Sequence, residues 1–283
     1  MTAPESVRGS TAPMATLVAF HAHPDDECIT TGGTLARAVD EGHRVVVVYG
    51  TRGEVGEVPD GLLGPGENLV ERRMAEVERS TAALGVHRLE FLGYRDSGML
   101  GTADNDDPRA FWQADVDEAA ARLAAILRDE RADVLLVYDE NGNYGHPDHV
   151  QVHRVGVRAA ELAGTPQVLE ATVNRDSVRA MIEIMIAAGE ASWDDVPDLD
   201  DPDQPFGMPD EVITTRVDVR PWADRKRAAM QAHETQVGDL APFLAMPFDV
   251  FREAMGTEYF IRRGAAPGHR DDDVFAGLDL AAR

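Results

Sequence analysis

The chain has 283 residues, of which 43% are hydrophobic, and its formal net charge at pH 7 is -24. This hydrophobic content is enough for a substantial core, while the negative charge disfavours nucleic acid and anionic membrane surfaces as partners. The single cysteine excludes an intramolecular disulfide and a thiolate metal cage, and no apolar run reaches the roughly 18 residues of a membrane span.

Residues 1–13 are rich in Ser, Thr, Pro and Ala, with one arginine and no apolar segment. This composition predicts a flexible arm and not a secretory signal, so we expect a cytoplasmic protein. Residues 14–283 contain no internal repeat and no clear linker. We therefore expect them to form a single α/β domain.

Strand-like and helix-like segments alternate through the first 170 residues. Short apolar runs rich in β-branched residues, such as Val45–Tyr49, predict strands that are buried on both faces. The expected strands cover residues 15–20, 45–49, 88–92, 133–138 and 167–171. Apolar residues at helical spacing predict helices within 35–42, 70–85, 116–126 and 147–163. This alternation predicts a Rossmann-like, doubly wound, mainly parallel sheet with right-handed crossovers.

The last third of the chain is less regular. Residues 194–210 contain seven aspartates and four prolines, which predicts a solvated loop. A further strand is expected at 212–219 and a further helix at 221–232.

Unusual polar clusters follow four of the expected strands, at residues 21–27, 51–57, 93–99 and 139–149. The carboxyl ends of parallel strands share one edge of a sheet, where ligands bind in folds of this class. The first cluster, His21-Ala22-His23-Pro24-Asp25-Asp26-Glu27, places three carboxylates directly after a buried strand. Their mutual repulsion and desolvation favour a bound cation.

His23 and Asp26 are three residues apart, a spacing that lets both side chains reach one ion. A third ligand is expected from the stretch His146-Pro147-Asp148-His149. Two histidines and one carboxylate leave a coordination position open, as in catalytic zinc sites. Fe2+ or Co2+ would fit the same donors nearly as well.

Several of these residues have ordinary alternative roles. Asp25 could cap a helix, and Cys28 is expected to be a small core residue. Ser97 lacks the Gly-x-Ser-x-Gly elbow of serine hydrolases. Arg72 and Arg73 lie on a helix, and one of them could reach a pocket. Ordinary hydrogen-bonded roles are expected for the histidines outside the clusters: His43, His87 and His269.

The combination of His23-Pro24-Asp25-Asp26-Glu27 with His146-Pro147-Asp148-His149 resembles the LmbE/PIG-L family of zinc-dependent N-acetylglucosamine deacetylases. The resemblance covers about residues 15–165, with a weaker echo at Ala232-His233-Glu234-Thr235-Gln236. Within the family, the chain is similar to the actinobacterial mycothiol enzymes, the inositol-glucosamine deacetylase and the mycothiol S-conjugate amidase.

The resemblance implies an LmbE-like fold and zinc-dependent hydrolysis of the N-acetyl amide of a glucosamine-containing small molecule. His23, Asp26 and His149 would bind one zinc ion. Asp25 would be the general base that takes a proton from the attacking water and passes it to the leaving amine. Two side chains of the first cluster are left for supporting roles: His21 and Glu27.

The resemblance also implies roles for residues farther along the chain. His146, oriented by Asp148, would stabilise the oxyanion or act as general acid, and Tyr144 would add a hydrogen bond to the tetrahedral intermediate. Arg73 and Asp96 match family positions that hold the sugar or polyol of the substrate.

The sequence leaves the substrate branch open. Tyr138–Gly142 resembles the amidase branch, Thr30 is closer to the deacetylase branch, and Gly256–Phe260 resembles unassigned members that could act on amino sugars of secondary metabolites. A non-catalytic carbohydrate-binding protein is the alternative from another class, and a metallophosphoesterase would bring two metals and more ligands. The oligomeric state is also open, a homo-oligomer included.

Overall fold

The computed structural model describes residues 14–59, 61–189, 192, 196, 198–201 and 204–279. The arm expected at residues 1–13 lies outside these ranges. None of the helices in the described ranges has both the length and the apolar character that a membrane span requires.

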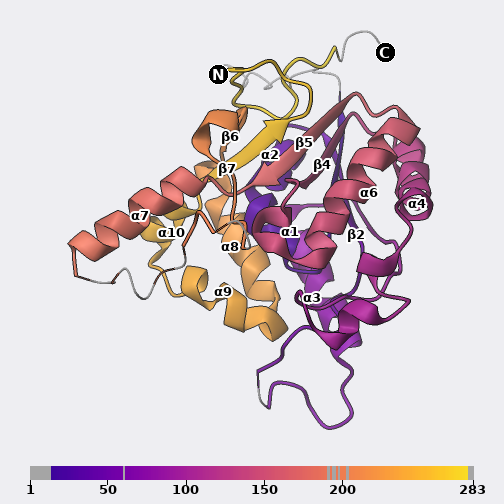
Figure 1. The fold of residues 1–283 in the computed structure, drawn as a ribbon, viewed down its shortest axis with the longest axis horizontal. Coiled ribbons are helices and arrows are strands. Elements are labelled where there is room, and N and C mark those ends of the chain that lie inside the picture. Colours follow the sequence, from indigo (N-terminus) through magenta and orange to yellow (C-terminus); the bar gives the residue numbers. More distant parts are fainter. Residues whose placement is uncertain are drawn as a thin grey trace, which may run out of the picture.

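Seven strands form one mixed sheet in the order β3-β2-β1-β4-β5-β7-β6 (Figure 1). The first five strands run parallel. They are β1 (Thr16–His21), β2 (Arg44–Tyr49), β3 (Arg88–Phe91), β4 (Val134–Tyr138) and β5 (Gln167–Thr172). At the centre, Leu17 of β1 pairs with Val45 on one side and with Val134 on the other, and every residue of β1 is buried. The predicted doubly wound α/β fold is confirmed.

Helices cover both faces of this sheet. On one face α4 (Val116–Glu130) and α6 (Pro147–Ala163) pack against each other over β4. On the other face α2 (Gly32–Asp40), α3 (Leu69–Leu84) and α8 (Ala223–Ala232) form a second layer. A short helix, α1 (Asp26–Thr30), directly follows β1. Right-handed crossovers produce this division, because the connections from β1 to β3 and from β3 to β5 run in opposite directions along the sheet.

The C-terminal third extends the same sheet with two antiparallel strands, β6 (Thr215–Asp218) and β7 (Thr257–Arg262). The strand expected at 212–219 is therefore shorter, since a 3-10 turn occupies Asp210–Val212. Strand β7 was not expected, because its inward-facing Glu258 interrupts the apolar pattern of a strand. The described part of the expected loop at 194–210 contains no helix or strand of its own before this turn.

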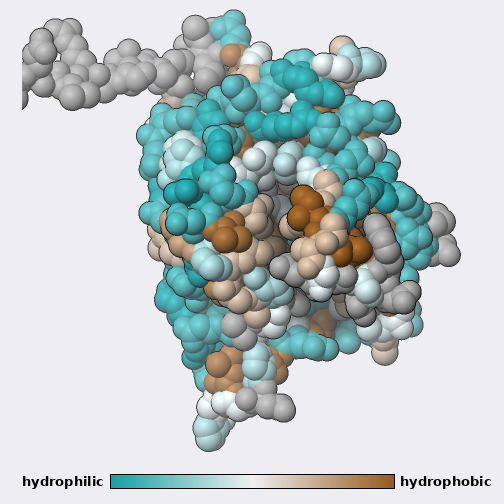
Figure 2. All heavy atoms as spheres, turned by 90° about the vertical axis from the view of Figure 1, so that its left-hand side faces the viewer, coloured by the Kyte–Doolittle hydropathy of each residue, from teal (hydrophilic) through white to brown (hydrophobic). Residues whose placement is uncertain are grey.

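Three helices of this region were also missed: α7 (Arg175–Ala187), α9 (Val237–Leu244) and α10 (Phe248–Ala254). Helix α7 projects from the body of the molecule (Figure 1) and buries none of its residues. The face on this side is largely hydrophilic, with hydrophobic atoms gathered around a hollow near its middle (Figure 2). Large hydrophobic side chains that α7 and α10 expose are Met181, Ile184, Met185, Phe248 and Val250.

Strand β7 is tied to the helices by a buried ion pair. Lys226 Nζ of α8 lies 2.7 Å from Glu258 Oε1, and the two side chains are 2% and 1% exposed. The same carboxylate accepts the backbone N–H groups of Gly33 and Thr34 in the first turn of α2, each at 2.8 Å. Glu258 thereby satisfies otherwise unpaired donors at the start of that helix.

Lys226→Met is expected to lower the free energy of unfolding by about 3–5 kcal/mol, because it leaves the Glu258 carboxylate buried without its cation. Urea unfolding followed by circular dichroism measures this change. Arg158→Gln is the matched control, since it breaks a solvent-exposed pair with Asp117 and is expected to leave the transition nearly unchanged. Equal transitions for the two variants would contradict the prediction.

Candidate active site

The four polar clusters meet at the carboxyl edge of the sheet, around the point between β1 and β4 where the strand order reverses. The rings of His23, after β1, and His146, after β4, lie 4.7 Å apart. Asp96, after β3, has a carboxylate oxygen 3.5 Å from His23 Nε2. The loop after β2 joins them through Gly53, whose carbonyl accepts a hydrogen bond from Arg73.

Asp25 has a strained backbone at the turn between β1 and α1. Its φ is 122° and its ψ is -30°, a conformation that residues other than glycine rarely adopt. Asp25 directly precedes α1, but its side chain makes no capping hydrogen bond, so the helix-cap alternative does not apply. Strained residues of this kind persist where the surrounding structure holds them in place, and they cluster at functional sites.

The Asp25 carboxylate is buried beside the guanidinium group of Arg73. Burial raises the pKa of Asp25 to about 7, with the neighbouring Asp26 adding to the increase and Arg73 opposing it. Arg73 Nη2 lies 3.9 Å from Asp25 Oδ1 and donates to the carbonyl of Pro24 at 2.9 Å. Arg72 instead points to the surface, where it pairs with glutamates. Arg73 is therefore the member of the pair that faces the site.

Among the predicted metal ligands, Asp26 lies next to both histidines. Asp26 Oδ2 is 3.5 Å from His23 Nδ1, and Asp26 Oδ1 is 3.3 Å from His149 Nε2. Burial alone would lower the pKa of His23, but Asp96, Asp148 and Asp26 raise it well above its usual value. The site thus attracts positive charge. Two imidazole nitrogens and a carboxylate fit a divalent cation such as zinc.

A second donor set shares two of these residues. Ring nitrogens of His23, His146 and His149 lie within 4.8 Å of one another. His146 is also the residue that precedes α6, and its Nδ1 accepts the Asp148 backbone N–H at 3.1 Å. A neutral His146 therefore carries its proton on Nε2. Burial, followed by the neighbouring His23 and His149, lowers the pKa of His146 to about 2, which keeps the ring neutral.

Asp148 contacts His146 through its backbone N–H, while its carboxylate holds His23. Its Oδ2 lies 3.2 Å from His23 Nε2 and accepts the Ser97 backbone N–H at 2.9 Å. The Ser97 hydroxyl donates to Oδ1 of the same carboxylate. Because Asp148 lies in the first turn of α6, its N–H faces His146 while its side chain points to the β3 loop. Ser97 gave no signal of this role in the sequence.

Tyr144 and Asp96 also lie at the site. Tyr144 is 46% exposed, and its hydroxyl oxygen is 3.5 Å from His149 Nε2, so it lies on the solvent side of the histidines. Asp96 is buried and accepts the Gly98 N–H at 2.8 Å. Burial alone would raise the pKa of Asp96, but His23 holds it well below its usual value. All the residues predicted for catalysis, metal and substrate are thus close to one edge of the sheet.

His21 of the first cluster and Cys28, just after it, support the turn. His21 Nδ1 lies 2.8 Å from the Tyr138 hydroxyl, and its Nε2 lies 3.1 Å from Thr31 Oγ1. Cys28 is fully buried, and its thiol donates to the Asp25 carbonyl at 2.8 Å. Burial raises the pKa of the Cys28 thiol well above its usual value, which suits a core residue and not a nucleophile.

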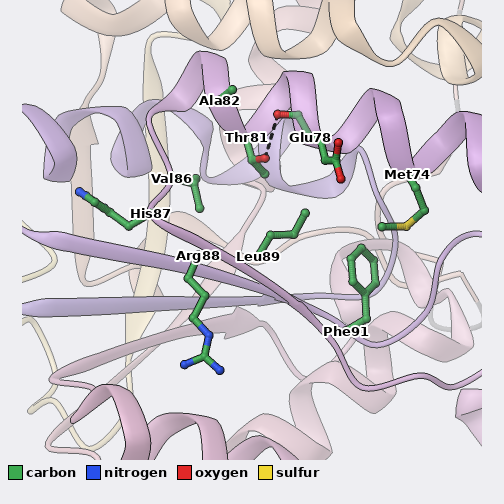
Figure 3. A pocket seen from close by; sticks show the side chains of 9 residues that line it. All are labelled: Met74, Glu78, Thr81, Ala82, Val86, His87, Arg88, Leu89 and Phe91. Atoms are coloured by element: carbon green, nitrogen blue, oxygen red, sulfur yellow. Dashed lines mark hydrogen bonds between the residues drawn. The ribbon is translucent and has the colours of Figure 1, made fainter.

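A separate groove of about 480 Å3 lies between α3 and β3 (Figure 3). Its lining includes Met74, Leu89 and Phe91 but none of the residues predicted for the site. The Arg88 charge in this groove is already paired with Asp129 and Glu130, at 2.6 and 2.7 Å. The groove therefore lacks the converging titratable groups that mark the edge of the sheet.

Both the sequence and the fold of this chain are similar to those of known proteins. Residues 18–160 match the family model described as PIG-L, GlcNAc-PI de-N-acetylase. A protein of Acidothermus cellulolyticus is 47% identical over 280 residues, which cover 93% of this chain and 95% of that protein. A protein of Geodermatophilus obscurus is 45% identical over 296 residues, which cover 94% of this chain and 99% of that protein. Both are named 1D-myo-inositol 2-acetamido-2-deoxy-alpha-D-glucopyranoside deacetylase.

Solved structures with the same fold include the N,N'-diacetylchitobiose deacetylase from Pyrococcus horikoshii. Its TM-score is 0.55 at 21% identity, covering 88% of this chain and 82% of that one. A conserved protein from Thermus thermophilus has a TM-score of 0.57 at 22% identity, covering 88% and 95%. The family model and the relatives that match along nearly their whole length show that the chain belongs to the PIG-L family, as its two histidine and aspartate motifs had predicted.

Proposed function

We propose that this protein hydrolyses the N-acetyl amide of a glucosamine–inositol conjugate and releases acetate and a free amine. One observation carries the proposal: a single buried turn places the Asp26 carboxylate 3.5 Å from His23 Nδ1 and 3.3 Å from His149 Nε2, while the neighbouring Asp25 carboxylate lies apart from them beside Arg73. Asp26 is held ionised among the histidines, while burial raises the pKa of Asp25 to about 7. Such a pair separates a metal ligand from a general base. The names of the relatives supply the substrate class.

His23, Asp26 and His149 are the residues proposed to hold the metal, and zinc is the ion that this donor set suits best. When bound there, zinc would polarise the amide carbonyl and lower the pKa of a water molecule. Asp148 and Asp96 would fix the ring of His23 from the opposite nitrogen, an arrangement common behind metal-ligating histidines.

Asp25 is the proposed general base. Its carboxylate removes a proton from the water whose oxygen forms the new bond to the acetyl carbon. When the C–N bond breaks, the protonated carboxyl returns this proton to the leaving nitrogen. A pKa near neutrality suits both steps, because the group must accept and then release the same proton.

His146 is the proposed donor to the developing oxyanion. Its Nδ1 already accepts the Asp148 N–H, so the neutral ring presents Nε2–H to the reacting centre. A neutral imidazole is a poor acid, which favours oxyanion stabilisation over proton delivery for this residue. The hydroxyl of Tyr144, a partly exposed residue next to His149, is proposed as a second donor.

Asp96 and Arg73 are proposed to bind the sugar or polyol of the substrate. For Arg73 the contacts favour an additional role on Asp25. Its guanidinium is buried, donates to the carbonyls of Gly53 and Pro24, and lies beside the Asp25 carboxylate.

Acetate release from a panel of N-acetylglucosaminides, the inositol conjugate included, tests the proposal. Free amine is read by mass spectrometry before chelation of the metal, after it, and after zinc is added back. Activity that survives complete metal removal would contradict the proposal. Adding mycothiol S-conjugates to the panel separates a deacetylase from an amidase, because only the amidase would hydrolyse them. Binding without turnover would indicate a carbohydrate-binding protein.

The pH profile of kcat/KM is expected to rise as Asp25 ionises, with its acid limb at or below about pH 7, since a bound cation lowers the pKa of Asp25 further. Arg73→Met removes the positive neighbour that opposes the rise in this pKa. The acid limb should therefore move upward by about one pH unit. Kinetics from pH 5 to pH 9 measure the limb, and an unchanged limb would show that Arg73 does not act on the base.

A further inference from the structure

Glu27, the last residue of the first cluster, is held from the C-terminal third of the chain. His233 Nε2 lies 2.8 Å from Glu27 Oε1, and both side chains are 0% exposed. Ser80 of α3 donates its hydroxyl to the same oxygen. The other oxygen, Glu27 Oε2, accepts the backbone N–H of Asp25 at 2.9 Å. A chain of contacts therefore leads from His233 to the strained residue of the site.

These contacts oppose the strain at Asp25. A non-glycine residue with φ of 122° is strained and stays in place only where its surroundings over-determine it. Glu27 holds the N–H of Asp25, while Arg73 holds the carbonyl of Pro24 just before it. The backbone is thus fixed on both sides of the peptide that sets the direction of the Asp25 carboxylate.

His233 is itself firmly placed. It follows α8 directly and precedes a 3-10 turn, Glu234–Gln236. Within this turn Thr235 donates both its N–H, at 3.1 Å, and its hydroxyl, at 2.5 Å, to the carboxylate of Glu76 in α3. Residues separated by more than two hundred positions therefore form one buried polar network beside the base.

We propose that His233 is a positioning residue of the reaction. It holds the Glu27 carboxylate, and Glu27 in turn holds the backbone of Asp25 so that the Asp25 carboxylate faces the attacking water. This inference rests on the proposed function, in which Asp25 is the general base.

A second metal site is the competing explanation for this cluster. Donor atoms of Glu27, Cys28 and His233 lie within 4.8 Å of one another. Both Glu27 oxygens, however, already accept hydrogen bonds, and the Cys28 thiol donates to the Asp25 carbonyl. Both Glu27 oxygens, the Cys28 thiol and His233 Nε2 therefore have partners without an ion, whereas His233 Nδ1 has none.

A double-mutant cycle with Asp25→Asn tests the proposal. In the wild-type background His233→Met is expected to lower kcat by about 10- to 100-fold, with KM nearly unchanged and one metal ion still bound. His233→Gln, whose amide can donate to Glu27, should recover most of this loss. In the Asp25→Asn background His233→Met should cost at most about twofold more, because the base it positions is already absent.

Several results would overturn the inference. One is that His233→Met lowers kcat equally in the wild-type and Asp25→Asn backgrounds, and another is that His233→Gln recovers none of the loss. A third is that the wild-type chain binds two metal ions and His233→Met binds one. Full activity of Asp25→Asn alone would instead overturn the proposed function. If His233→Met does not fold, Glu27→Gln is measured in the same two backgrounds, with the same expected pattern.

The matched control is His43→Met. His43 is also a buried histidine, whose Nδ1 accepts the Ala15 N–H at 3.1 Å and whose ring stacks on Phe275, away from the site. Its replacement should lower stability and leave kcat unchanged. A loss of kcat in His43→Met equal to that in His233→Met would show a general effect of destabilisation and would contradict a positioning role.

Discussion

Asp25→Asn is expected to lower kcat by about 100- to 10,000-fold while one metal ion stays bound per chain. The carboxamide has the shape of the carboxylate but no basic oxygen, so it removes general base catalysis and little else. Asparagine also tolerates a positive φ better than most residues, so the turn at Asp25 should survive the change. Steady-state kinetics and metal content by mass spectrometry measure the two effects.

Asp25→Ala serves as the companion variant, because it removes both the base and the side-chain shape. Equal losses in the two variants would assign the effect to the missing carboxylate. Normal turnover by Asp25→Asn would mean that another group takes the proton, and the assignment of Asp25 as base would then be wrong.

Asp26→Asn is expected to abolish tight metal binding, and activity with it. The Asp26 carboxylate lies between His23 Nδ1 and His149 Nε2, and a neutral amide there cannot compensate the charge of a divalent ion. The loss of metal affinity should exceed the roughly 100-fold that removal of an outer partner of a ligand costs. Titration with zinc, followed calorimetrically, measures it.

His146→Gln distinguishes the two possible donor sets. If Asp26 completes the set, His146→Gln keeps the metal and lowers kcat by about 100- to 1,000-fold, the cost of losing one oxyanion donor. The reverse result, with metal lost in His146→Gln and kept in Asp26→Asn, would assign the three histidines as ligands.

Local sequence patterns were sufficient to predict the parallel part of the sheet. The run Val45–Tyr49 forms a buried strand because β-branched side chains pack well on both faces. Pro147 begins α6 because its fixed φ suits the first helical turn, and Gly164 ends the helix in a left-handed conformation. These preferences act within a few residues, so the sequence alone reveals them.

The candidate ligands and base could be predicted for a related reason. His23, Asp25 and Asp26 follow one buried strand, and His149 lies in a second cluster that follows another. Parallel strands bring such clusters to one edge whatever the details of packing. The turn between β1 and α1 could therefore be identified as half of a site before its geometry was known.

Tertiary structure alone decided the partners of these residues. Arg72 and Arg73 are neighbours in sequence, but successive side chains of a helix point about 100° apart, and only the packing of α3 turns Arg73 inward. The carboxylate of Asp148 contacts His23 and Ser97 because the loop after β3 lies beside the first turn of α6. A local pattern carries no information on which loop will be the neighbour.

The antiparallel end of the sheet shows the same limit. From the sequence, Glu258 would be taken for a surface residue, but in the structure Lys226 and the start of α2 surround it. His233 would likewise be taken for an ordinary histidine, but it contacts Glu27. A buried charge is tolerated only when it is paired. The partners of Glu258 and His233 lie 32 and 206 positions away in the sequence. The sequence by itself determined which chemical groups gather at the edge of the sheet, and the packing of distant segments decided how each is held.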